Sequence, residues 1–308
     1  MTSIKIGIVG LGKIARDQHV PALLSSDAFE LVGVADIRTQ LSGVPSFGDL
    51  GSLAIGVPNL AAVALCTPPQ VRYEIARDAL ERGLHVLLEK PPAISVSEVQ
   101  ALQEIANRNG RALFAAWHSR YAPAVSPARS WISTRQVRRV TVSWKEDVRV
   151  WHPGQRWIWR AGGLGVFDPG INALSILSDI LPGQLALTGA ELHVPSNCET
   201  PIAARLSLSD AHGAPIEAAF DFRQQGPQTW DIVVETNDGS LILSMGGKRL
   251  SVAGVPSAID DIPEYRALYA KFAQLVHAGR CDVDIMPLQL VADAFLCGSR
   301  IEEPPFIE

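Results

Sequence analysis

A lysine stands where a buried strand is expected to end, in the segment Glu89-Lys90-Pro91-Pro92, directly after the apolar run 85–88. A fixed ammonium group beside a dinucleotide suits hydride-transfer chemistry, in which negative charge develops on an alcohol oxygen. Taken alone, the segment is better interpreted as a strand end followed by a turn. The upstream sequence favours the chemical interpretation, because it predicts a dinucleotide site one nucleotide-binding unit earlier in the chain.

Asp168 and Asn172 form a second candidate site. Pro169 follows the aspartate, which predicts that Asp168 caps a helix and that the proline takes the first helical position. Asn172 lies one turn further along the same helix face. Because the positive end of the helix dipole favours anionic species there, we expect Asp168 both to cap the helix and to take part in catalysis.

The segment between these two sites, residues 144–160, holds four of the seven tryptophans, interleaved with charged side chains. Aromatic faces stack on C–H surfaces, and carboxylate and imidazole groups bond hydroxyls, so this composition predicts a sugar pocket. The alternative is an aromatic loop that plugs a domain interface. The candidate binding residues in this segment are Glu146, Trp151 and His152.

A glycine-rich turn, residues 10–15, follows the apolar run 4–9 and has the G-x-G-x-x-A spacing of a dinucleotide-binding turn. Asp36 ends the next strand-like run, about twenty residues later, where an acid usually bonds the adenosine ribose. Its charge repels a 2′-phosphate and favours NAD, although Arg38 leaves NADP open; the alternative is that Asp36 only forms a turn or a helix cap. The predicted cofactor contacts are Gly10, Gly12, Lys13, Ile14, Asp36, Arg38, Cys66, Thr67, Pro68, Glu89 and Lys90.

Strand-like and helical runs alternate through the first half of the chain, with strands at 4–9, 29–35, 61–65, 85–88 and 113–116. This pattern predicts a Rossmann-type α/β domain with a doubly wound parallel sheet. Thr67, Lys90 and His118 all follow strand ends, where such sheets bind ligands. Later strand-like runs at 137–144, 203–208, 216–222, 229–236 and 240–244 are grouped, and helical runs at 263–277 and 287–300 close the chain. They predict an α+β domain with a large open, mainly antiparallel sheet. We place the domains at 1–119 and 120–308.

The amino-acid composition argues for a soluble globular enzyme and against several other classes of protein. The 308 residues are 47% apolar and 19% charged, which is typical of a soluble globular enzyme. The net charge of -5 argues against nucleic-acid binding. Four scattered cysteines argue against a zinc site and a disulfide framework, so we expect no metal and a cytoplasmic location. The sequence shows no signal peptide and no run long enough to span a membrane.

The glycine-rich turn, Glu89-Lys90-Pro91 and the motif Gly163-x-Gly165-x-x-Asp168-x-Gly170-x-Asn172 together resemble the glucose-fructose oxidoreductase/inositol dehydrogenase family over essentially the whole chain. Within that family the chain is most similar to the bacterial L-arabinose 1-dehydrogenases and D-galactose 1-dehydrogenases, through segments 12–19, 68–73, 117–120 and 144–155. The resemblance implies NAD(P)-dependent oxidation of the anomeric carbon of an aldopyranose to the lactone. It also implies that the open sheet can mediate oligomerisation, for example as a homodimer.

One position departs from the wider family, many members of which have a histidine in place of Asn172. Because asparagine cannot act as a base near neutral pH, the proton acceptor is Asp168 or Lys90. We expect Asp168 to accept the C1 hydroxyl proton and Lys90 to stabilise the charge on the same oxygen. The predicted substrate contacts are Lys90, His118, Glu146, Trp151, His152, Asp168 and Asn172. The alternatives are a dehydrogenase that acts on a secondary alcohol of a cyclitol or of another sugar, as in inositol dehydrogenases, and an NAD-sensing regulator without catalysis.

Overall fold

The computed structural model describes residues 3–260 and 262–307, which form two compact units. The first contains the chain up to Trp117 together with Tyr265–Asp284, and the second contains His118–Glu264 and the residues from Ile285 onward. The predicted division after residue 119 differs by two residues and did not include the return of Tyr265–Asp284. The return has a packing cause: Phe272 in the returning segment stacks on Phe29 and Phe114 of the first sheet.

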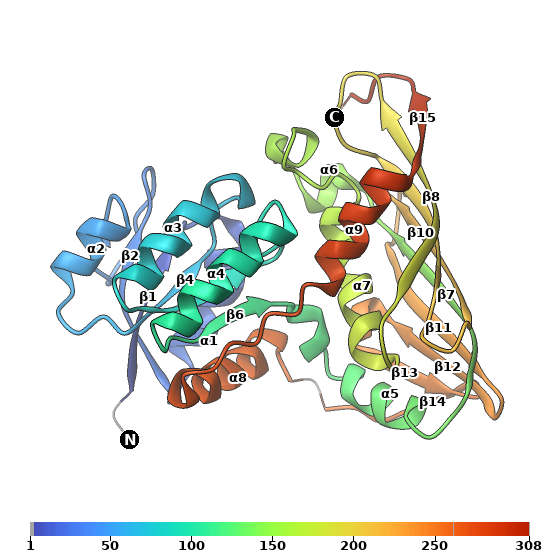
Figure 1. Ribbon diagram of the computed structural model, residues 1–308, viewed down its shortest axis with the longest axis horizontal. Coiled ribbons are helices and arrows are strands. Elements are labelled where there is room, and N and C mark those ends of the chain that lie inside the picture. The colour runs from blue at the N-terminus through green and yellow to red at the C-terminus, as the bar shows by residue number, and fades with distance from the viewer. Residues whose placement is uncertain (1–2, 261, 308) are drawn as a thin grey trace. The chain divides into compact units, whose positions relative to one another are not determined.

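The described residues of the first unit form a parallel six-stranded sheet in the order β3-β2-β1-β4-β5-β6 (Figure 1). The neighbouring strands β4 and β5 are buried along their whole length, as parallel strands covered on both faces should be. Helices α2, α3 and α4 pack on one face, while α1 and α8 cover the other. The elements are β1 (Ile4–Val9), α1 (Val20–Leu24), β2 (Phe29–Ala35), β3 (Ser46–Phe47), α2 (Leu50–Gly56), β4 (Ala62–Leu65), α3 (Pro69–Glu81), β5 (His85–Glu89), α4 (Val96–Arg108), β6 (Leu113–Ala116) and α8 (Glu264–Ala278), with a wide helical turn at Ala15–His19.

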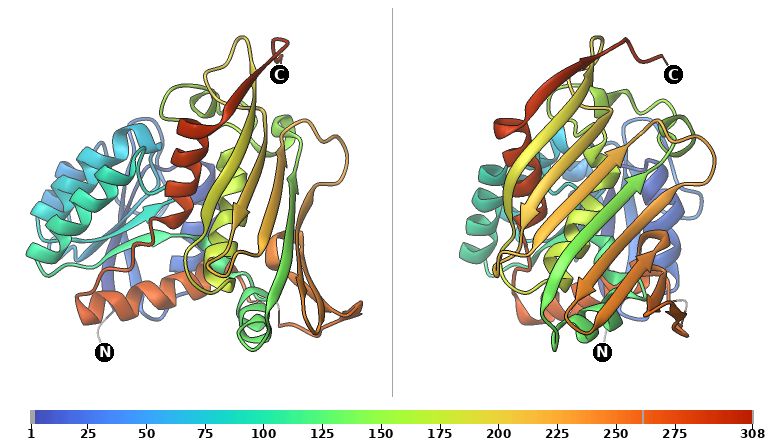
Figure 2. Two further views of the ribbon diagram at one scale, coloured as in Figure 1. Left: turned by 45° about the vertical axis from the view of Figure 1, so that its right-hand side comes forward. Right: turned by 90° about the vertical axis from the view of Figure 1, so that its right-hand side faces the viewer.

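The described residues of the second unit form a nine-stranded mixed sheet in the order β14-β13-β12-β11-β7-β10-β9-β8-β15. All neighbours are antiparallel except β10 with β7 and β15 with β8. Helices α7 and α9 lie against one face, and the described residues place no helix on the other (Figure 2). The elements are α5 (Val125–Ile132), β7 (Val137–Lys145), α6 (Val148–Trp151), α7 (Phe167–Ile180), β8 (Ala186–Pro195), β9 (Ala203–Ser209), β10 (Pro215–Asp221), β11 (Thr229–Thr236), β12 (Gly239–Ser244), β13 (Arg249–Val252), β14 (Val255–Pro256), α9 (Met286–Cys297) and β15 (Ser299–Glu303), with short 3₁₀ turns at His118–Tyr121, Arg156–Trp159 and Met245–Gly247.

Both predicted fold classes are confirmed, but one predicted helix is wrong at its end. The run 287–300 continues as a helix only to Cys297, and Ser299–Glu303 forms strand β15 beside β8. The chain leaves the helix at Gly298, whose backbone is extended (φ -73°, ψ 141°). A side chain there would collide with the carbonyl oxygen of Ala294, so glycine permits the sharp exit. No helix in the described part of the chain is long and apolar enough to cross a membrane.

Candidate active site

The glycine-rich turn after β1 has the geometry of a phosphate cradle. Gly10 adopts φ +89°, and a Cβ atom there would lie 2.8 Å from the backbone nitrogen of Thr67, so only glycine fits. A Cβ atom on Gly12 would meet nothing within 4 Å, which leaves open space above the backbone. Such a turn lets the main chain approach a pyrophosphate closely.

Asp36 follows β2 and is tied to this turn. One carboxylate oxygen accepts the N–H of Leu11 at 2.7 Å, and the other accepts the N–H groups of Arg38 and Thr39 at 2.8 and 2.9 Å. Partial burial opposes the charged form, but these three backbone bonds outweigh it and lower the pKa of Asp36. An ionised carboxylate is therefore held beside the glycine turn, where the sequence predicted a ribose contact.

Most of the other predicted cofactor residues occupy the turn itself and the segment after β4. Lys13 is exposed and forms an ion pair with Asp17 one helical turn later. After β4, the buried side-chain oxygens Thr67 Oγ1 and Gln70 Oε1 have no hydrogen-bond partner among the described residues. Because buried polar atoms are normally paired, these two oxygens fit a site that receives a polar ligand. The first unit thus has the features a bound dinucleotide needs.

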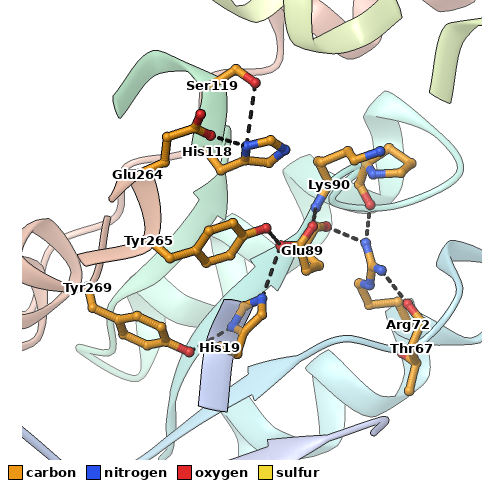
Figure 3. A network of polar contacts seen from close by, with 11 residues as sticks. His19, Thr67, Arg72, Glu89, Lys90, His118, Ser119, Glu264, Tyr265 and Tyr269 are labelled. Atoms are coloured by element: carbon orange, nitrogen blue, oxygen red, sulfur yellow. Dashed lines mark hydrogen bonds and ion pairs between the residues drawn. The ribbon is translucent and has the colours of Figure 1, made fainter. Parts of the chain in front are cut away.

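The side chain of Glu89, at the end of β5, is buried and bonds Lys90, Tyr265 and His19 (Figure 3). Its Oε2 accepts the backbone N–H of Lys90 at 2.7 Å, while its Oε1 accepts the hydroxyl of Tyr265 at 2.5 Å and lies 3.0 Å from Nε2 of His19. The other ring nitrogen of His19 bonds the hydroxyl of Tyr269 at 2.7 Å. We call these four residues, Glu89, His19, Tyr265 and Tyr269, the Glu89 network.

Two buried basic side chains, His19 and Arg72, support the Glu89 network and the backbone around Lys90. Burial opposes protonation of His19, but the neighbouring Cys66, Tyr269 and Glu89 together raise the pKa of His19 well above its usual value. On the other side, the buried guanidinium of Arg72 donates to the carbonyl oxygens of residues 67, 89 and 91. Figure 3 shows the backbone of Lys90 held between these two sets of bonds. The side chain of Lys90 therefore extends from a backbone whose position is fixed by hydrogen bonds.

The second unit contains a cluster built around Asp168, which is 3% exposed. His152 Nδ1 lies 3.4 Å from Asp168 Oδ2, and His152 Nε2 lies 2.9 Å from Glu146 Oε1. The second oxygen of Glu146 accepts the indole N–H of Trp230 at 2.8 Å. We call these four residues, Asp168, His152, Glu146 and Trp230, the Asp168 cluster. The structure thus brings together three predicted substrate residues, Glu146 and His152 from the tryptophan-rich segment and Asp168 from helix α7.

The helix that carries Asp168 starts earlier than predicted. Helix α7 begins at Phe167 and its capping position is Val166, so Asp168 lies inside the first turn of the helix. The prediction that Asp168 caps the helix is therefore wrong. A glycine turn starts the helix instead: Gly165 has φ +54°, and its carbonyl accepts the N–H of Asp168 at 2.9 Å. The Asp168 side chain contacts His152 of the cluster from this first turn.

The other predicted substrate residues of this unit differ in their surroundings. Asn172 is half-buried one turn along α7, and its buried Oδ1 has no hydrogen-bond partner among the described residues. His118 bonds Glu264 through Nδ1 at 2.7 Å. Trp151 is 40% exposed and meets Trp230 edge to face with ring centres 4.7 Å apart. Of these three residues, Trp151 contacts the Asp168 cluster, through Trp230, and offers an exposed aromatic ring of the kind that stacks on sugars.

The tryptophans of residues 144–160 differ in burial: some pack in the core and one lies at the surface. Trp144 and Trp159 are buried, with Trp159 against Phe222 and Trp144 stacked on Trp230. Trp151 is the most exposed of its four tryptophans. Within residues 3–260 and 262–307, no group of three histidine, cysteine, aspartate or glutamate side chains is placed to hold a metal ion.

Residues 4–116 match the family model described as an oxidoreductase family with an NAD-binding Rossmann fold, GFO/IDH/MocA. Over its full length the chain is 46% identical to galactose 1-dehydrogenase of Pseudomonas fluorescens, in an alignment of 310 residues that covers 100% of both proteins. The chain belongs to the GFO/IDH/MocA oxidoreductase family. The resemblance inferred from the sequence motifs is therefore confirmed.

Solved structures agree with this membership. The crystal structure of D-galactose-1-dehydrogenase from Rhizobium etli superimposes with a TM-score of 0.95 at 49% identity, covering 100% of this chain and 99% of the other. A 3-ketoreductase from Actinomadura kijaniata, solved with NADP and TDP-benzene, has a TM-score of 0.85 at 18% identity over 98% and 100% of the two chains. At that identity the second likeness shows the shared fold. As a GFO/IDH/MocA member, the chain is an NAD(P)-binding oxidoreductase.

Some residues of both clusters were not predicted as site residues. Trp230 was overlooked, although it lies directly opposite Trp144 in the β11–β7 pairing. A correct strand register would have placed it beside the tryptophan-rich stretch. His19, Arg72, Tyr265 and Tyr269 carry no local signal of their role, because each acts through contacts with distant parts of the chain.

Proposed function

We propose that this chain is an NAD(P)-dependent aldose 1-dehydrogenase that oxidises the anomeric carbon of D-galactose, L-arabinose or both to the aldonolactone. The observation that carries the proposal is the Asp168 cluster, a buried carboxylate beside an imidazole, in a chain 46% identical from end to end to a galactose 1-dehydrogenase. An alcohol oxidation needs a proton acceptor sheltered from water, and Asp168 has that character. The bound dinucleotide would supply the electron acceptor.

In this proposal Asp168 accepts the proton of the C1 hydroxyl, and Lys90 stabilises the charge on the same oxygen. The Glu89 network supports the lysine by anchoring its backbone. Asn172 is well suited to bind another hydroxyl, because its buried oxygen lacks a partner among the described residues. We assign the remaining hydroxyl and ring contacts to His118, Glu146, Trp151 and His152.

For the cofactor we propose the contacts predicted from the sequence, with NAD preferred and NADP accepted. The lowered pKa of Asp36 keeps its carboxylate charged, which disfavours a 2′-phosphate. Arg38 is exposed two residues later and offers a positive charge to that phosphate. Steady-state kinetics with both cofactors tests this: Asp36→Ala should lower the NAD preference, and Arg38→Ala should raise it.

D-Galactose and L-arabinose share their configuration at C2, C3 and C4 and differ by the exocyclic CH₂OH at C5. One such group is worth about 1–3 kcal/mol of discrimination in an apolar pocket. We therefore propose that the enzyme turns over both sugars, with a preference of no more than roughly 200-fold. A larger preference would indicate that polar groups recognise the C5 substituent.

Two substitutions test the catalytic assignment. Lys90→Ala and Asp168→Ala should each lower kcat by at least roughly 10²-fold while the Kd for NAD stays within about threefold. Asp179→Asn is a matched control, because this carboxylate lies on the same helix but pairs with Arg129 near the protein surface. Near-full turnover by either alanine variant would refute its assigned role. Oxidation of cyclitols but of no aldose by the wild type would refute the proposed substrate class.

We further propose a homodimer formed through the face of the nine-stranded sheet that lacks helices, in a cytoplasmic enzyme with its four cysteines reduced. This face carries small and polar side chains, among them Ser143 and Ala219, which are paired across β7 and β10. Small side chains permit close approach of two sheets. Sedimentation equilibrium should show a dimer for the wild type, and Ala219→Arg should shift it toward the monomer.

A further inference from the structure

His152 lies between two buried carboxylates and contacts them through different ring nitrogens. Nε2 is 2.9 Å from Glu146 Oε1, and Nδ1 is 3.4 Å from Asp168 Oδ2. The two carboxylate side chains are 2% and 4% exposed, and the imidazole is 13% exposed. The backbone of this segment is tied to the end of β10, since Glu146 N–H donates to Asp221 and Val148 N–H donates to Phe222.

Glu146 determines which nitrogen of His152 carries the proton. Its Oε2 accepts the indole N–H of Trp230, which leaves Oε1 for the imidazole. An ionised carboxylate only accepts hydrogen bonds, so Nε2 of His152 must be the donor. A neutral imidazole protonated at Nε2 carries a lone pair at Nδ1.

In this tautomer no proton lies between Nδ1 of His152 and the carboxylate of Asp168. Nδ1 and the Asp168 oxygen are then both acceptors, and Nδ1 is buried without a hydrogen-bond partner among the described residues. Adding one proton would convert the 3.4 Å contact into a charge-assisted hydrogen bond. Asn172, one turn further along α7, cannot take up a proton because its side chain is an amide. The base in contact with Asp168 is therefore the imidazole of His152.

We propose that His152 is the proton-sharing partner of Asp168, oriented by Glu146 and Trp230. The inference rests on the proposed function, in which the sugar loses a hydroxyl proton to Asp168. The O–H bond breaks, the proton goes to Asp168 Oδ2 and then to Nδ1, and the resulting imidazolium keeps its Nε2–H on Glu146. The electron pair left on the sugar oxygen forms the carbonyl bond as C1 transfers its hydrogen, with two electrons, to the oxidised nicotinamide dinucleotide. The imidazolium loses its proton to water after the lactone leaves.

Chemical rescue tests the basic role separately from the shape of the ring. His152→Ala should lower kcat for galactose by roughly 10²-fold. Added imidazole should restore at least a tenth of the lost kcat, whereas pyrazole, of similar shape but a far weaker base, should not. His193→Ala is the control, because His193 also pairs with a carboxylate, Glu303 at 2.7 Å, but lies outside the Asp168 cluster. Equal rescue by both molecules, or unchanged kcat in His152→Ala, would overturn the inference.

The tautomer can be measured without any turnover. In protein labelled with ¹⁵N-histidine, His152 should be protonated at Nε2, its signals being identified by their loss in His152→Gln. In Glu146→Gln the amide oxygen must accept from Trp230, so the amide N–H faces Nε2 and the ring proton should move to Nδ1. A wild-type ring protonated at Nδ1 would refute the proposal. Failure of the wild type to oxidise any aldose would refute the proposed function instead, which keeps the two failures distinguishable.

Discussion

His85 makes the stability of the first unit depend on pH. The ring is buried at the start of β5, and its Nδ1 accepts the N–H of Ala112 at 2.9 Å. Burial, followed by the positive charges of Arg111 and His277, lowers the pKa of His85 to about 4. Protonation at Nδ1 would also break the bond to Ala112. The folded protein therefore keeps this imidazole neutral at a pH where the unfolded chain protonates it.

The sign and size of the effect follow from linkage. The unfolded pKa of histidine is about 6.5, so between about pH 6.5 and pH 4 the unfolded state binds more protons than the folded state. The contribution of His85 is complete above pH 6.5 and is lost as the pH falls toward 4. The fall in the pKa of His85 from about 6.5 to about 4 corresponds to about 3 kcal/mol, and residual solvation of the ring reduces this to about 2–3 kcal/mol.

Urea unfolding followed by circular dichroism at pH 7 and at pH 4 measures this contribution. In His85→Asn, the amide oxygen can accept the Ala112 N–H but cannot be protonated in this range. The free energy of unfolding of the wild type should fall by about 2–3 kcal/mol more than that of the variant. His212→Asn, at an exposed histidine, should behave like the wild type. Equal losses in the wild type and in His85→Asn would refute the reasoning.

Three further substitutions probe the backbone and the Glu89 network. Gly10→Ala should weaken NADH binding at least roughly tenfold in a fluorescence titration, because the new methyl group meets the backbone of Thr67 at φ +89°. Gly165→Ala should lower the free energy of unfolding by about 2–4 kcal/mol in urea denaturation, since its Cβ would overlap the carbonyl oxygen of Pro201. Glu89→Gln should lower kcat roughly tenfold or more while the sugar KM changes little, because it loses the charge paired with buried histidine but can keep the acceptor for the lysine N–H.

Each of these outcomes has a clear contrary result. Unchanged NADH affinity in Gly10→Ala would place the pyrophosphate away from this turn. Wild-type stability in Gly165→Ala would mean that the loop before α7 relaxes freely. A Glu89→Gln variant with unchanged kcat would show that the Glu89 network supports folding without influencing the lysine.

The sequence determined those features that depend on neighbours within a few residues. The glycine turn at residues 10–15 is set by steric limits on φ, and the parallel sheet follows from the alternation of apolar strands with helices. The place of Lys90 after a buried strand follows from the same local pattern. Even here local rules failed once: the cap predicted at Asp168 was displaced because the turn at Gly165 starts the helix earlier.

Only the tertiary structure decided which side chains meet. Tyr265 reaches Glu89 from 176 residues away, and Tyr269 reaches His19 from 250 residues away, because α8 returns to pack on the first sheet. Glu146 meets Trp230 across 84 residues through the pairing of β7 with β11. Such meetings depend on strand register and helix packing, which many weak contacts set together and no short motif encodes. The sequence thus predicted the glycine turn, Lys90 and Asp168, while the fold decided which side chains lie beside them.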